Sequence, residues 1–234
     1  MLDGGPVRYL VIGAAGHAQE VAWSLREQAK ARGETCRLDF FDDVVAPGPL
    51  AFGLGEVVGR LEDARDLAER GQGSLVLGIG LPRMKSAVVA RLRCRDELWT
   101  TVIHPTAVVG PAVSIGAGSY VGPGAVLTVG VRLGRFTTIN THCLAAHGDS
   151  FGEFVTLHPD AHVSGEVTIE EGCELGAGSV VIPGLRIGAW SVLGAGCVAV
   201  RDLPGGRTWV GVPARDLRGD DELEAVLVPG LEAR

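Results

Sequence analysis

A six-residue repeat runs through the second half of the chain and narrows what this sequence can fold into. Every sixth residue from Ile103 to Ala199 is apolar, at seventeen positions without a slip. The residue four places after each of these is small or aliphatic at fifteen of sixteen positions, and Asp149 is the exception. A period that holds its phase for this long indicates one structural unit used again and again.

Six residues are enough for one short strand and one corner, so three repeats complete a triangular coil. The two apolar phases must then point inward, where each side chain stacks on its counterpart in the next coil. Glycine, which directly follows the apolar residue at eight of the positions, eases the close packing and the corner conformations. The repeat therefore predicts a left-handed parallel β-helix of about five to six coils, a known exception to right-handed crossovers.

The first hundred residues follow a different pattern, in which apolar β-branched runs alternate with helix-favouring segments. We expect strands at 7–12, 37–43 and 74–80, a helix within 13–33, and helices over 61–71 and 81–95. Alternation of this kind is typical of a parallel sheet with crossover helices. The sequence thus predicts two domains: a small Rossmann-like α/β domain at 1–100, and the β-helix with a C-terminal arm at 101–234.

Charge and composition exclude several classes of partner. The net charge of −7 argues against nucleic acid or an anionic membrane as the main partner. No run of apolar residues is long enough to span a bilayer, and the first residues lack the pattern of a signal peptide. Five cysteines without metal-binding spacing fit a reducing compartment, so we expect a cytoplasmic protein.

Six segments, in order along nearly the whole chain, resemble one branch of the hexapeptide acyltransferases. This branch comprises the nucleotide-sugar N-acetyltransferases and sialic-acid O-acetyltransferases of bacterial glycan synthesis. The matching segments are VIGAAGHAQEVA (11–22), FFDD (40–43), LGIGLPRMK (77–85), VIHPTAVV (102–109), INTHCLAAHGDSFGEF (139–154) and WVGVPAR (209–215). The resemblance implies a homotrimer with its sites between neighbouring prisms, acetyl-CoA as a cosubstrate, and no tightly bound cofactor.

Acetyl transfer from a thioester requires a base that takes the acceptor's proton, and histidine suits this role because its pKa lies near neutrality. His147 lies outside the two inward phases, so we expect it to face outward into an intersubunit groove. The resemblance also places the catalytic histidine at His147. The relatives carry an acid directly after it, whereas this chain has Gly148. Asp149 is then either the displaced partner of His147 or a local distortion of the coil.

The resemblance places the acetyl donor along the C-terminal coils. It implies that coenzyme A contacts the backbone near Gly176, Ala195 and Gly196, and that the GVPAR segment lies near its phosphates. Arg215 could bind a phosphate bidentately, or it could be a solvated arginine. Thr156 and His158 fall close to the donor in the resemblance. The family's more common histidine stands at the position of Thr156, so its function could have shifted to His158, or His158 could be an ordinary corner histidine.

The glycine loop that follows the first strand is expected to hold the acceptor. Gly13, Gly16 and His17 lie between a strand and a helix, which suits a phosphate cradle, yet the loop lacks the dinucleotide pattern GxGxxG. In the resemblance this domain holds the nucleotide of the sugar acceptor. Asp42 and Asp43 would contact its base or ribose, with Gly80 and Arg83 nearby. The alternative is that the loop is a tight turn and the acids only end a strand.

Three other functions stay open beside N-acetylation of a nucleotide-linked amino sugar. The same base would serve O-acetylation of a sialic acid or another sugar hydroxyl. His142 and His147, five residues apart, keep a zinc lyase of the γ-carbonic-anhydrase type in view, although we expect no metal. Gly148 leaves room for a non-catalytic hexapeptide protein. His104 is expected to be structural.

Overall fold

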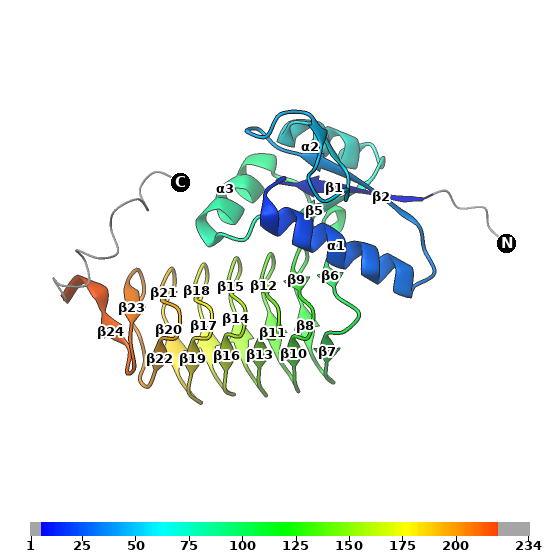
Figure 1. Ribbon diagram of the computed structural model, residues 1–234. Coiled ribbons are helices and arrows are strands. Elements are labelled where there is room, and N and C mark those ends of the chain that lie inside the picture. Colours follow the sequence, from blue (N-terminus) through cyan, green and yellow to red (C-terminus); the bar gives the residue numbers. More distant parts are fainter. Residues whose placement is uncertain (1–5, 220–234) are drawn as a thin grey trace.

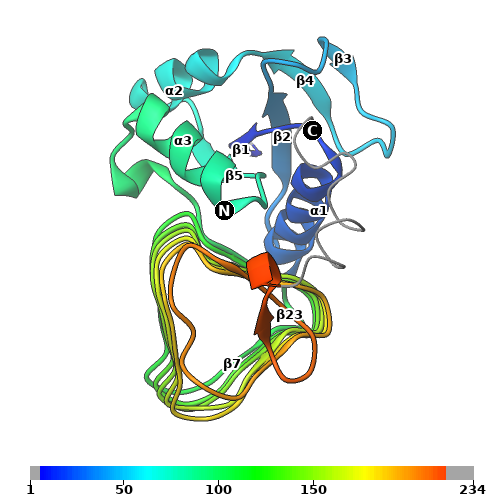
Figure 2. The ribbon, with the colours of Figure 1, turned by 90° about the vertical axis from the view of Figure 1, so that its left-hand side faces the viewer.

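The computed structural model describes residues 6–219, and the last stretch of the predicted C-terminal arm, 220–234, lies outside them. An α/β unit sits on one side of a long triangular prism (Figures 1 and 2). No helix among the described residues is long and apolar enough to cross a membrane.

The α/β unit is built on a five-stranded sheet in the order β3-β4-β2-β1-β5. Its pairs are parallel except for β3 with β4. The strands are β1 (Val7–Ile12), β2 (Cys36–Phe41), β3 (Gly48–Pro49), β4 (Glu56–Gly59) and β5 (Ser74–Leu77). The helices are α1 (Gly16–Ala31), α2 (Leu61–Glu69) and α3 (Pro82–Leu92), followed by the 3₁₀ turn η1 (Asp96–Leu98).

Local sequence explains where these helices begin and end. Pro82 starts α3, where its missing N–H costs no helix hydrogen bond. The Asp63 carboxylate accepts a hydrogen bond from the Arg60 amide at 2.8 Å and so satisfies a free amide at the start of α2. Gly78 lets α1 pack closely, because a Cβ there would lie 2.6 Å from the Ala18 Cβ. These contacts place the loop before α1 beside the end of β5.

The prism consists of three sheets whose strands are two or three residues long and pair in parallel, except for β23 with β24. We call the eight-stranded sheet, which contacts the α/β unit, the domain-facing sheet; the six-stranded and five-stranded sheets are the second and third sheets. Each strand pairs with the strand one coil further on, as Thr138 does with Thr156, so a coil spans eighteen residues (138 to 156). The parallel prism predicted by the repeat is therefore present, and Figure 2 shows its triangular cross-section.

The strands follow one another in the order domain-facing, second, third. The domain-facing sheet contains β6 (Val102–Ile103), β9 (Tyr120–Val121), β12 (Thr138–Ile139), β15 (Thr156–Leu157), β18 (Glu174–Leu175), β21 (Val192–Leu193), β23 (Thr208–Val210) and β24 (Arg215–Asp216). The second contains β7 (Val108–Val109), β10 (Val126–Leu127), β13 (Leu144–Ala145), β16 (His162–Val163), β19 (Val180–Val181) and β22 (Val198–Ala199). The third contains β8 (Ser114–Ile115), β11 (Arg132–Leu133), β14 (Ser150–Phe151), β17 (Thr168–Ile169) and β20 (Arg186–Ile187). The 3₁₀ turn η2 (Leu217–Gly219) follows β24.

Most residues of the two predicted inward phases form one continuous core inside the prism. Burial of each aliphatic side chain contributes about 1.5–3 kcal/mol, which favours stacking coil upon coil. Val109 belongs to the same phase but is 41% exposed, because β7 pairs only with β10 and ends its sheet. Cys143, Cys173 and Cys197 are buried in this core as free thiols.

Lys85 joins the two parts of the chain. Its side chain is fully buried, and its Nζ lies within hydrogen-bonding distance of four oxygens on the prism. These are the carbonyls of Phe136 and Val155 and the hydroxyls of Thr138 and Thr156, at 2.8–3.2 Å. Burial lowers the pKa of Lys85 well below its usual value, with Glu174 acting weakly in the opposite direction.

This burial predicts a pH-dependent stability that Lys85→Met should remove. The unfolded chain binds a proton at Lys85 up to a pH near 10.5, whereas the folded chain releases it at a lower pH. Between those two values the free energy of unfolding of the wild type should rise with pH, by up to about 1.4 kcal/mol per pH unit. Denaturant titrations between pH 7 and 10 measure this slope.

Lys30 supplies the matched control, because it is the only other lysine in the chain and its side chain is 77% exposed. Lys30→Met should keep the wild-type slope, and Lys85→Met should lose it. An unchanged slope in Lys85→Met would mean that Lys85 keeps its proton in the fold.

Candidate active site

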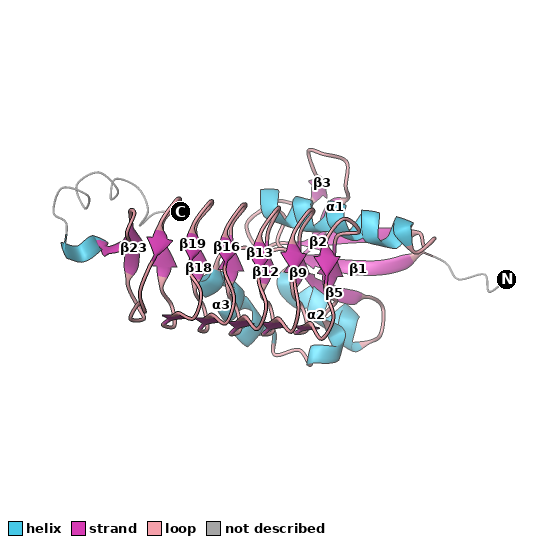
Figure 3. Cartoon of the chain, turned by 90° about the horizontal axis from the view of Figure 1, so that it is seen from below, coloured by secondary structure: helices cyan, strands magenta, loops and turns pink. Residues whose placement is uncertain are grey.

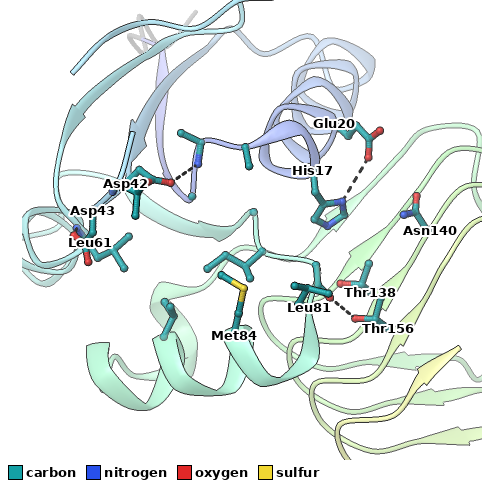
Figure 4. Close-up of a pocket in the computed structure, with 18 of the residues that line it drawn as sticks. His17, Glu20, Asp42, Asp43, Leu61, Leu81, Met84, Thr138, Asn140 and Thr156 are labelled. Carbon is teal, nitrogen blue, oxygen red and sulfur yellow. Dashed lines mark hydrogen bonds and ion pairs between the residues drawn. The ribbon is translucent and has the colours of Figure 1, made fainter. Parts of the chain in front are cut away.

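A cavity of about 660 Å³ lies between the α/β unit and the domain-facing sheet (Figure 4). The loop after β1, the end of β2, the start of α3 and two coils of the prism line it. Of the residues predicted to bind the acceptor or the donor, seven line this one cavity: Gly13, His17, Asp42, Asp43, Gly80, Thr156 and His158. Residues far apart in sequence therefore meet in one site.

The carboxylate of Asp42 shapes the glycine loop. It accepts a hydrogen bond from the Ala14 amide at 2.9 Å and from the amides of Val44 and Val45 at 2.8 and 2.9 Å. Gly13 adopts a φ of +94°, which favours glycine over other residues. Asp42 thus contributes to the site by holding two loops together at the end of β1.

Asp43 lies in a small ionic cluster at the same end of the cavity. Arg91 from α3 donates to its Oδ2 at 2.6 Å, and Arg60 lies 3.5 Å from its Oδ1. Burial tends to raise the pKa of Asp43, but the hydrogen bonds from Arg91 and the Leu61 amide outweigh burial and lower it. An ionised carboxylate beside a guanidinium can bind a nucleobase or a ribose through acceptor and donor groups together.

His17 extends from the first turn of α1 toward the prism, as Figure 4 shows. Its Nδ1 lies 3.5 Å from a carboxylate oxygen of Glu20, and the hydrogen bond from His17 lowers the pKa of Glu20. Its ring packs edge-on against Tyr120, and its Nε2 has no hydrogen-bond partner among the described residues. His17 therefore contributes its ring to the lining of the cavity, while the Nε2 atom itself is buried.

The prism contributes the opposite wall through Thr138, Asn140, Thr156 and His158. The Thr156 hydroxyl accepts from Lys85 Nζ at 2.8 Å and donates to the Gly80 carbonyl at 2.6 Å. His158 Nε2 lies 2.7 Å from Glu174 Oε1, which is one coil further along the sheet. This wall therefore carries hydroxyl and amide groups and one histidine–carboxylate pair.

Two of the predicted acceptor residues lie elsewhere. The Arg83 guanidinium stacks over the Trp190 ring at 5.3 Å and is not among the residues that line the cavity. Gly16 borders a neighbouring hollow with Trp23 and Phe52. Arg83 follows Pro82 at the start of α3, and from there its side chain extends to Trp190 on the prism and away from the cavity.

His147 lies at the corner between the second and third sheets, and it is exposed. In a triangular prism this corner is opposite the domain-facing sheet, so the His147 of a given chain is remote from the cavity of the same chain. His142 lies at a different corner, between the domain-facing and second sheets, with Nδ1 3.7 Å from an oxygen of Asp160. The two histidines therefore do not converge within one chain.

Asp149 is fully buried inside the prism, and its carboxylate accepts hydrogen bonds from the backbone. The Ala146 amide donates to one oxygen at 2.8 Å and the Val167 amide to the other at 2.9 Å. Burial raises its pKa despite these bonds. The strands on both sides keep their register, so the coil is not distorted there. Instead of bonding the imidazole of His147, Asp149 fastens the turn that carries it.

The residues expected to hold the donor lie along the corner between the domain-facing and second sheets. Gly176 begins one turn at this corner, and Ala195 and Gly196 are exposed in the turn one coil further on. Within residues 6–219, the Ala177 and Ala195 amides donate no hydrogen bond to the protein. Arg215 is exposed at the start of β24. His104, at the first turn of this corner, bonds Thr106 and packs against Trp23.

Several residues of the cavity were not predicted from the sequence. Arg91 is one of many arginines on helices, and only its place opposite the end of β2 gives it a role. Glu174 follows His158 by sixteen residues, a spacing close to one coil. A search for polar pairs in the outward phase, about one coil apart, could have found it. Asn140 and Thr138 also occupy positions outside the two apolar phases.

The fold and the site together define a class: a parallel β-helix protein with an α/β unit and an interdomain cavity. A perosamine N-acetyltransferase mutant from Caulobacter crescentus, solved in complex with CoA and GDP-perosamine, is similar to this chain in structure. It is 32% identical, the match covers 91% of this chain and 96% of that chain, and the TM-score is 0.79. The acetyltransferase domain of PglB from Neisseria gonorrhoeae, in complex with acetyl coenzyme A, is 29% identical over 91% of this chain and all of that chain, with a TM-score of 0.78.

The chain belongs to the hexapeptide-repeat acyltransferases, in the branch of the nucleotide-sugar N-acetyltransferases and sialic-acid O-acetyltransferases, as the resemblance indicated. Among curated proteins, UDP-3-O-acylglucosamine N-acyltransferase 2 of Rhodopseudomonas palustris is 32% identical over 125 residues, which are 52% of this chain and 31% of that protein. The chain spans 26% to 60% of the length of the first curated relatives it matches. No protein-family model matches the chain.

Proposed function

We propose that this protein transfers the acetyl group of acetyl-CoA to the amino group of a nucleotide-linked amino sugar. The observation that carries the proposal is the single cavity in which the glycine loop, the acidic end of β2 and the polar wall of the prism meet. A structural relative at 32% identity over nearly its whole length was solved with CoA and a nucleotide-linked amino sugar. Acetyl-CoA is then a cosubstrate, and the protein is cytoplasmic.

The acceptor's nucleotide binds at the end of the cavity formed by the α/β unit. The loop from Gly13 to His17 lies over the nucleotide's phosphates, and Asp43 with Arg91 lies beside its base or ribose. Asp42 supports this arrangement through the three backbone amides it accepts from. The sugar then extends toward Thr156 and His158 on the wall of the prism.

His147 acts as the general base from a neighbouring copy of the chain. Its exposed place on the corner remote from its own cavity suits a homotrimer in which each cavity faces the neighbour's corner. It takes a proton from the acceptor nitrogen as the nitrogen attacks the thioester carbonyl. Asp149 positions His147 through the turn whose amides it binds.

Coenzyme A binds along the corner that carries Gly176, Ala195 and Gly196. The Ala177 and Ala195 amides, which the protein leaves without an acceptor in the described part of the chain, suit the amide carbonyls of a pantetheine arm. Arg215 in the segment that follows the last coil suits a phosphate of the donor.

Thiol release from acetyl-CoA tests the reaction. We expect release with one of a panel of nucleotide-linked amino sugars that includes GDP-perosamine, unaffected by a chelator, and no release with sialic acids. Release with sialic acid alone would move the acceptor to a hydroxyl group, and sensitivity to the chelator would revive the zinc lyase. Binding of CoA without release for any acceptor would contradict the proposal and favour a non-catalytic protein.

A further inference from the structure

His158 and Glu174 form a histidine–carboxylate pair on the wall of the acceptor cavity. His158 follows β15, Glu174 begins β18, and the 2.7 Å contact joins Nε2 to Oε1 across one coil. Their side chains are 34% and 23% exposed, so the pair is partly withdrawn from solvent. His158 lines the cavity, and Glu174 contacts it from outside the set of lining residues. An ionised carboxylate only accepts hydrogen bonds, so Nε2 carries the proton and Nδ1 is left as the basic nitrogen.

The acceptor chemistry requires two proton removals. A primary amine is mainly an ammonium ion at neutral pH, and an ammonium nitrogen has no lone pair for attack. The ion must lose one proton before the C–N bond forms and a second as the tetrahedral adduct collapses. The balanced reaction is R–NH₃⁺ plus acetyl-S-CoA giving R–NH–acetyl, CoA-SH and one free proton. The thiolate takes one of the two protons, and solvent takes the other.

We propose that His158, paired with Glu174, binds the acceptor's ammonium group and removes its first proton before His147 acts. The N–H bond breaks, its electron pair stays on nitrogen as the nucleophile, and the proton passes through His158 Nδ1 to solvent at the mouth of the cavity. The charge of Glu174 attracts the ammonium and stabilises the imidazolium that forms. This inference rests on the proposed amine acetylation.

The contrast between the two histidines supports this division of roles. The ring of His147 makes no hydrogen bond within residues 6–219, and Gly148 stands where the relatives carry an acid. The ring of His158 has a carboxylate partner and lines the cavity of its own chain. In this scheme His158, already paired with Glu174, is the base that the chain supplies to its own cavity, and His147 is the base that the neighbouring chain supplies.

Other charged groups surround the pair from each element that packs near it. His17 and Glu20 line the same cavity from α1. The buried Lys85 of α3 contacts Thr156, and the charge of Glu174 acts to raise the pKa of Lys85. The sheet edge carries the exposed pair of His142 with Asp160. Asp42, Asp43 and Arg91 belong to the nucleotide end of the cavity and already bond one another or the backbone.

The test is the pH dependence of kcat/KM for thiol release with the amino sugars of the panel. His158→Gln should lower kcat/KM at pH 7 by about 100-fold, the low end of the usual contribution of a general base. The loss should shrink as the pH rises toward 10, because a growing fraction of the acceptor amine is then neutral before it binds. Glu174→Gln should change the profile in the same way as His158→Gln but less: kcat/KM should fall by a smaller factor at pH 7, and this loss should also shrink at alkaline pH. The KM for acetyl-CoA should not change in either variant.

His162→Gln is the matched control, because His162 is exposed on β16 and outside the cavity. A loss that is equal at all pH values would assign His158 a purely structural role, and no loss would remove it from the mechanism. The wild type in the same assay separates the two proposals. Release by wild type with an unaffected His158→Gln overturns the pair alone, whereas no release with any amine overturns both.

Discussion

His147→Ala is expected to lower turnover by about 10²- to 10⁴-fold, the usual contribution of a general base. CoA binding should survive, because the donor corner lies along a different edge of the prism. Nucleotide binding should survive too, since the residues at the nucleotide end of the cavity, Asp43 and Arg91 among them, all belong to the α/β unit. Steady-state thiol release, together with direct binding of CoA and of the nucleotide, measures all three quantities.

His162→Ala serves as the control for this prediction, because it removes another exposed histidine of the neighbouring strand β16. It should keep wild-type turnover. Equal turnover in His147→Ala would remove His147 from the mechanism. A loss that alkaline pH restores would instead give His147 the role proposed for His158.

The prism could be predicted from the sequence because its geometry is local. A period of six repeats one strand and one corner, and every coil meets only its neighbours, so the inward phases follow directly from counting. Asp149 broke the pattern and was noticed for that reason. Its role could not be foreseen, because the amides it binds, Ala146 and Val167, belong to two different coils.

The contacts between the two parts of the chain could not be predicted. Lys85 meets Thr156 across 71 residues, and nothing in the helix that carries Lys85 distinguishes a buried lysine from an exposed one. The cavity exists because this contact holds the start of α3 against the prism, with the Thr156 hydroxyl bound to the Gly80 carbonyl. Figure 3 shows α3 and α1 lying across the coils on the far side of the prism.

Some site residues could be predicted because strand order alone brings them together, whereas the position of others depends on how the helices and coils pack. Gly13, Asp42 and Gly80 each follow a strand of one parallel sheet, so the rule that carboxyl ends of strands meet at one edge brings them together. Arg83 departs from this set because its direction depends on the orientation of α3. His158 could be identified only as a corner histidine until its partner Glu174, one coil away, was seen.

Mixed assemblies give the most direct prediction about His147. Neither His147→Ala nor Asp42→Ala should be active alone: the first lacks the base, and the second loses the carboxylate that organises the glycine loop. Coexpression at equal levels should nevertheless restore about one quarter of wild-type turnover, because one neighbour contact in four joins an intact cavity to an intact His147.

This recovery follows from the geometry of the prism. The corner that carries His147 is opposite the domain-facing sheet, so only a second chain can bring the imidazole of a His147 to the cavity. Thiol release by the coexpressed assembly, compared with the same two variants purified separately and then mixed without exchange of subunits, measures it. If the coexpressed assembly is as inactive as either parent, while its size matches the wild type, base and acceptor belong to the same chain, and His158 with Glu174 is the pair within reach.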